Sequence, residues 1–162
     1  MAGSAVAKID YSEGITFKEL GRIEEALAIF RSGIEKMQLH VEANPSVGDY
    51  RWMLGELMFE LAMVIGPTDE GVSQLTLAKE HREILYRADP NHISYQQDIH
   101  AVIASLIAFQ DQMNRRDEAK ELIAAIADLP NASEVYENVA TKLADVKPPL
   151  SDELLGEIAQ MP

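Results

Sequence analysis

Residues 21–45 read GRIEEALAIFRSGIEKMQLHVEANP and contain one helix together with its start and stop. After Gly21, apolar residues recur at three- and four-residue steps, which places them on one face of a helix. These residues are Ile23, Ala26, Leu27, Phe30, Ile34, Met37 and Val41. Asn44 and Pro45 follow, and proline cannot continue a helix. The stretch therefore predicts a long amphipathic helix that ends before Pro45.

The proline that ends this stretch belongs to a repeated pattern. Pro45, Pro90 and Pro130 are each followed shortly by a tyrosine. The tyrosines Tyr11, Tyr50, Tyr95 and Tyr136 recur at intervals of roughly 40 residues, a period typical of stacked supersecondary units. The sequence therefore predicts an all-α fold, an α-solenoid of about three antiparallel helix pairs followed by C-terminal capping helices.

Turn residues mark the other helix boundaries. The later helices are expected to cover residues 46–65, 70–88, 91–113, 115–128 and 131–146, with a short last helix from Ser151. Left-handed caps are expected at Gly21, Gly66 and Asn114. Three N-terminal capping pairs are expected, namely Ser46 with Asp49, Ser94 with Gln97, and Asn131 with Glu134.

Lys147-Pro148-Pro149 interrupts the helical pattern and suggests two parts. Residues 1–146 are predicted to form the repeat domain, and residues 147–162 a proline-hinged capping helix or tail. The tail has an apolar stripe made by Leu150, Leu154, Leu155 and Ile158. We expect this stripe to cover the last repeat, because repeat arrays need capped ends. The alternative is an amphipathic segment that binds a partner or occupies a groove of its own chain.

The region around Gly21 resembles the tetratricopeptide repeat family. Gly14, Phe17, Gly21, Ala26 and Phe30 fall at the spacing of that family, and Leu54-Gly55 is similar to its Leu-Gly pair. Residues 21–26 (GRIEEA) also resemble residues 114–119 (NRRDEA). The resemblance covers residues 8–146 and implies paired helices, with small residues that allow close approach and aromatic residues that fill the space between the helices.

The chain departs from this family in two respects. The usual period is about 34 residues, so the longer interval here implies helices longer by a turn or two. In the middle unit, Ala78 is followed by Arg82 where the first unit has Ala26 and Phe30. The resemblance therefore implies an atypical, elongated array. In this family the first helix of each pair usually lines a concave face where extended peptides bind.

Charge and composition restrict the partners. The chain has 162 residues and a net charge of −13, from 14 basic and 27 acidic residues. Nucleic acids and anionic membranes are therefore not expected as partners, since both attract basic proteins. A basic or apolar protein segment is expected instead. The absence of cysteine, of a secretory signal in MAGSAVAKID and of a long apolar run leads us to expect a cytoplasmic protein.

No residue pattern predicts catalysis. The four histidines are His40, His81, His92 and His100, and none is spaced to share a metal ion on one helical face. Phosphate-binding, zinc-protease and serine-hydrolase motifs are absent from the sequence. We therefore expect no enzyme activity, no cofactor and no metal site.

The first helix of the middle unit carries the best candidate for a binding site. One apolar stripe consists of Tyr50, Leu54, Leu57, Leu61 and Val64, and a second of Trp52, Phe59 and Met63. The second stripe has two interpretations: it packs in the core against Gln97, Ala104 and Ala108 of the next unit, or it forms the wall of a peptide groove. The groove interpretation predicts these partner-binding residues: Tyr11, Trp52, Glu56, Phe59, Glu60, Met63 and Gln97.

The sequence thus predicts a non-catalytic scaffold that binds a protein segment on an acidic and aromatic concave face. In some members of the tetratricopeptide repeat family, lysine and asparagine side chains clamp the terminal carboxylate of a bound peptide. The matching positions of the first helices here hold no such clamp, so a ligand that ends in a carboxylate is not expected. The alternative is a structural subunit that assembles with copies of itself through the face of Trp52 and Phe59, or through its terminal helices.

Overall fold

The computed structural model describes residues 2–160, and their side chains from Lys8 onwards. Within these residues the chain forms eight α-helices and one short 3-10 helix, with no β-strand, so the all-α prediction is confirmed. The elements are α1 (Ala2–Glu19), α2 (Ile23–Ala43), α3 (Gly48–Ile65), α4 (Asp69–Ala88), α5 (Ile93–Gln112), α6 (Arg116–Ala125), η1 (Ile126–Asp128), α7 (Ala132–Ala144) and α8 (Asp152–Ile158). None of the described helices is long and apolar enough to cross a lipid bilayer.

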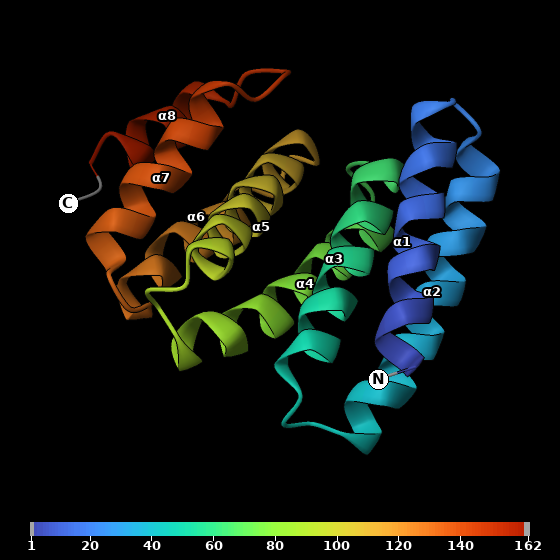
Figure 1. The fold of residues 1–162 in the computed structure, drawn as a ribbon. Helices are drawn as coiled ribbons and strands as arrows, with labels where there is room; N and C mark the ends of the chain where they lie inside the picture. The colour runs from blue at the N-terminus through green and yellow to red at the C-terminus, as the bar shows by residue number, and fades with distance from the viewer. Residues whose placement is uncertain (1, 161–162) are drawn as a thin grey trace.

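The helices follow one another in space in the order of the chain. Figure 1 shows α1 and α2 at one end and α6, α7 and α8 at the other. From α1 to α6 each helix packs against the next, and α1 also contacts α3, while α5 also contacts α7. One apolar core runs through the whole array, from Ala26 in α2 to Leu154 in α8.

The first helix pair depends on a close approach between Gly14 and Phe30. A Cβ atom at position 14 would collide with the Phe30 ring, and Phe30 and Ala26 are both fully buried. Glycine is therefore required where α1 crosses α2. This contact explains why the sequence combines a small residue in the first helix with an aromatic residue in the second.

Two of the three predicted left-handed caps, Gly21 and Asn114, have the expected backbone, and the prediction for Gly66 is wrong. Gly21 has φ of 71° and Asn114 has φ of 58°, so both adopt the left-handed region. Gly66 also has a positive φ, 81°, but its ψ of −168° keeps the chain extended rather than left-handed helical. Glycine tolerates both conformations because it has no Cβ atom.

The three predicted N-terminal capping pairs are wrong. Helix α3 begins after Val47 and α5 begins after His92, and neither start has a side-chain cap. Asn131 does precede α7, but its left-handed backbone (φ 53°, ψ 39°) differs from the extended conformation that a side-chain cap requires. A capping bond is present at α4 instead, where the Thr68 hydroxyl accepts the Gly71 N–H at 3.1 Å.

The tail after Lys147 lies against the last helices. Leu150 and Leu154 are buried, Ile158 is half-buried, and α8 packs against α6. Leu155, the fourth residue of the predicted stripe, is 45% exposed and does not contribute to this contact. The Asp111 carboxylate of α5 accepts hydrogen bonds from the Ser151 N–H and the Ser151 hydroxyl, both at 2.7 Å. These contacts fix the start of α8 on the body of the molecule.

Candidate interaction site

Four of the residues predicted to bind a partner lie together on α3. Trp52, Glu56, Phe59 and Glu60 are each half-buried. Their positions at three- and four-residue steps place them along one side of the helix. Each of these side chains contacts a residue from a neighbouring helix, so the group joins several elements.

Arg82 of α4 lies at the centre of this group. Its side chain is 3% exposed, and its guanidinium donates to Glu56 Oε1 at 2.5 Å and to the Asp98 carbonyl oxygen at 3.2 Å. The guanidinium carbon also lies 4.3 Å from the centre of the Phe59 ring, a distance at which a cation is attracted to an aromatic face. Arg82 therefore connects α3, α4 and α5.

Arg82 occupies the place in its helix pair that Phe30 occupies in the first. A Cβ atom built on Gly55 of α3 would lie 3.5 Å from Arg82 Cγ, an ordinary van der Waals distance, whereas one on Gly14 would collide with the Phe30 ring. The alkyl part of the arginine thus packs where an aromatic ring packs in the first pair, while its charged end continues beyond.

Trp52 is held by a hydrogen bond between units. Its indole N–H donates to Asp98 Oδ2 of α5 at 2.9 Å. This bond joins the first helix of one predicted unit to the first helix of the next. Asp98 was not among the predicted residues, because nothing in its local sequence distinguishes it from other solvent-facing aspartates.

Tyr11 and Glu60 connect the same group to α1. Lys18 Nζ lies 2.7 Å from Glu60 Oε2. Burial, together with the nearby charges of Glu56 and Glu60, raises the pKa of the Tyr11 phenol from 10.0 to about 12. Burial likewise raises the pKa of Glu56, although Arg82 opposes the shift.

The two carboxylates that were expected to receive basic side chains of a partner are therefore already paired. Glu56 binds Arg82, and Glu60 binds Lys18. A basic segment could reach Glu56 only by displacing a buried arginine, which would leave that guanidinium without its carboxylate. We call this part of the face the Arg82 network. Its charged groups pair with one another between helices, so they are not free to pair with a ligand. Its members are Tyr11, Lys18, Trp52, Glu56, Phe59, Glu60, Arg82 and Asp98.

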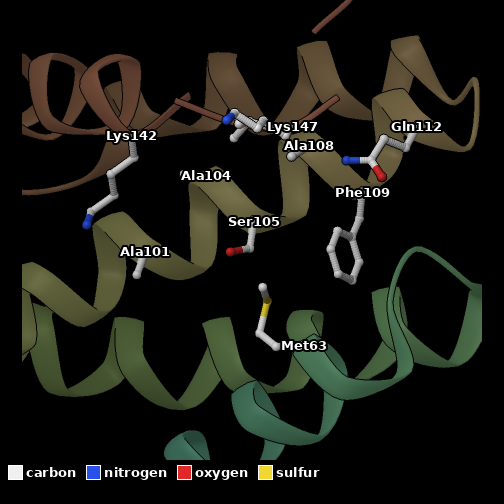
Figure 2. A pocket seen from close by; sticks show the side chains of 10 residues that line it. Met63, Ala101, Ala104, Ser105, Ala108, Phe109, Gln112, Lys142 and Lys147 are labelled. Carbon is white, nitrogen blue, oxygen red and sulfur yellow. The ribbon is translucent and has the colours of Figure 1, made fainter. Parts of the chain in front are cut away.

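A groove lies beyond this network, at the other end of α3. It has a volume of about 340 Å³ and is lined by Met63, Ala101, Ala104, Ser105, Ala108, Phe109, Gln112, Lys142, Val146 and Lys147. Met63 is 40% exposed, which is high for a large apolar side chain. Figure 2 shows Met63 rising from α3 towards Ser105 and Phe109 of α5, with Lys142 and Lys147 on the opposite side. We call this the Met63 groove.

The structure thus divides the predicted site residues among three places. Trp52, Glu56, Phe59 and Glu60 lie in the Arg82 network with Tyr11, whereas Met63 lies in the groove. Gln97 is exposed and lies outside the groove lining. Ala101, Ala104 and Ala108 of α5 line the same groove as Met63.

Sequence reasoning missed the two lysines of the groove. Lys142 is in the last turn of α7, where a basic residue also complements the helix dipole, and Lys147 follows the helix. Their position beside α3 and α5 results from tertiary packing, and no local motif predicts it. Among residues 2–160, no group of three or more His, Asp or Glu side chains could hold a metal ion.

Comparison of the chain with protein-family models, with curated proteins and with solved structures found no match.

Proposed function

We propose that the chain is a non-catalytic interaction module, an elongated tetratricopeptide-like solenoid that binds a protein segment. The contact of Gly14 with Phe30 beside the buried Ala26 supports the family resemblance, because those positions carry the family spacing. The packing of α1 on α3 and of α5 on α7 supports a stacked arrangement.

The observation that carries this proposal is the Met63 groove. It is an open, mainly apolar depression formed by residues from α3, α5 and the end of α7. Binding sites are typically concave and apolar with a few polar groups, and Ser105, Gln112 and the two lysines provide such groups here. An apolar side chain of a partner would be removed from water against Met63 and Phe109.

Selection of random peptides displayed on phage against the immobilised chain tests this function. Enriched peptides should bind the wild-type chain and lose binding to Ala101→Phe, because a large side chain on the lining residue Ala101 fills the groove. The matched control is Ala28→Phe on the exposed side of α2. Circular dichroism should show the same helix content for both variants. Failure to enrich any peptide, or equal binding to both variants, would contradict the proposal.

A second function, assembly with copies of the same chain, is favoured by a different observation. Ile9 in α1 is 63% exposed, and Leu20, just after α1, is 64% exposed. Large apolar side chains at the first end of a helical array provide a surface for a second copy. Light scattering over a range of concentrations tests this. Ile9→Lys with Leu20→Lys should convert a dimer to a monomer, and a wild-type monomer at all concentrations would contradict self-assembly.

A further inference from the structure

Two basic side chains that line the Met63 groove have no acidic partner among residues 8–160, as is also the case for Lys8 and Arg51 elsewhere on the surface. Most lysines and arginines of this chain form an ion pair within 4 Å, such as Lys36 with Asp10 at 2.8 Å and Lys79 with Glu83 at 2.7 Å. Within residues 8–160, Lys142 and Lys147 have no carboxylate at that distance, and both line the groove.

This arrangement is notable because carboxylates are abundant. Acidic residues outnumber basic ones by 27 to 14, so a lysine has many potential partners. The helix dipole accounts for Lys142 in the last turn of α7, but Lys147 lies beyond that helix. Two cations without an acidic partner in the described part of the chain therefore border the same apolar depression, on the side opposite Met63 (Figure 2).

We propose that the groove binds a protein segment with an apolar side chain next to a side-chain carboxylate. The apolar group would lie against Met63 and Phe109, and the carboxylate would lie on the side of the groove that carries the positive charges of Lys142 and Lys147. This inference rests on the proposed function and reverses the sign of the charge expected for the partner. The carboxylates of the Arg82 network are already paired, whereas the lysines of the groove are available.

The net charge of −13 does not prevent this recognition. Charges in water are screened beyond about 8 Å at physiological ionic strength, so the overall field slows the approach of an acidic segment more than it weakens the docked state. At contact distance the two lysines dominate. A bound apolar group next to them excludes water and strengthens the local pairing. Ser105 and Gln112 supply hydrogen-bonding groups in the same groove.

The test uses peptides enriched from the phage library against the full chain. They should combine Leu, Ile, Met or Phe with a nearby Asp or Glu. One such peptide, labelled with fluorescein, is titrated by fluorescence anisotropy against Lys147→Gln, Lys142→Gln and a matched control, Lys8→Gln. Lys8 is exposed and also has no carboxylate within 4 Å among residues 8–160, so the control removes the same charge elsewhere.

Each groove variant should weaken binding by about threefold or more, with little change for Lys8→Gln. Replacing the acidic residue of the peptide by its amide should have the same effect on the wild-type chain and almost none on the double variant Lys142→Gln/Lys147→Gln. Enriched peptides that are basic, or equal binding to the groove variants and the control, would overturn this inference while leaving the proposed function intact. Absence of any enriched peptide would instead contradict the proposed function, and this inference with it.

Discussion

The guanidinium of Arg82 donates a hydrogen bond to Glu56 across 2.5 Å, from α4 to α3, at a position where the arginine is 3% exposed. This ion pair joins α3 and α4. The contact between α1 and α2 is made instead by the aromatic ring of Phe30 against Gly14. Buried charges are tolerated only when they are paired, so each partner makes the other necessary.

Arg82→Leu should destabilise the fold by about 3–5 kcal/mol, because it leaves the half-buried Glu56 carboxylate without its partner. Urea unfolding measures the change. Arg31→Leu is the matched control, since Arg31 pairs with Glu70 at 2.8 Å but both side chains are about half exposed, and it should cost less than about 1 kcal/mol. Equal costs for the two variants would show that the Arg82 pair is no more important than a surface pair.

Asp98→Ala should shift the emission of Trp52 and destabilise the fold by about 1.5–3 kcal/mol, the range for hydrogen bonds to charged groups. Trp52 is the only tryptophan, so the fluorescence reports on this one site. Loss of the acceptor frees the indole N–H for water, and the emission maximum should move to longer wavelength. Glu35→Ala, at an exposed carboxylate of α2, should leave both properties unchanged. An unaltered spectrum in Asp98→Ala would contradict the hydrogen bond.

Stability should fall at alkaline pH because of Tyr11. Its pKa is raised from 10.0 in the unfolded chain to about 12 in the folded one, so the folded state holds the phenol proton more tightly. The contribution of the protonated Tyr11 phenol to the free energy of unfolding is complete below pH 10 and is lost as the pH rises towards 12. Urea midpoints across this range should decline less steeply in Tyr11→Phe than in the wild-type chain. Parallel declines would show that Tyr11 is not buried beside the carboxylates.

The turn after α1 should be sensitive to any side chain at Gly21. No atom lies within 4 Å of a Cβ placed there, so the cost of Gly21→Ala comes from its φ of 71° alone and should be about 1 kcal/mol. Gly156→Ala in α8 is the matched control, because its Cβ would also meet nothing within 4 Å while its backbone is helical. It should be neutral or stabilising by up to about 1 kcal/mol. Urea midpoints that move equally would contradict this assignment of strain.

The fold was largely predictable because its signals are local. Apolar periodicity and proline positions predicted the order of the helices, and Gly21 and Asn114 have the predicted positive φ. Two capping pairs were wrong because the helices begin at other residues than predicted: Val47 and His92 precede α3 and α5, so Ser46 lies one residue too early and Ser94 lies inside its helix. The third was wrong because a side-chain cap requires an extended backbone, whereas that of Asn131 is left-handed.

The candidate site was predictable only in part. The stripe of Trp52, Phe59 and Met63 was visible in the sequence, but its division into a network and a groove depends on contacts between distant segments. Arg82 was noted as a departure from a pattern, and its pairing with Glu56 emerged only from the packing of α4 on α3. Lys142 and Lys147 carry no local signal at all. Their importance comes from where the end of α7 lies.

The most direct test of the account is the methyl resonance of Met63 when an enriched peptide is added. In the chain labelled at its methionine methyl groups, this resonance should shift with the peptide concentration, because Met63 is 40% exposed and lines the groove. Met37, fully buried in α2, should not shift and provides an internal control. A peptide that binds the chain while the Met63 resonance stays unchanged would contradict the assignment of the groove as the interaction site.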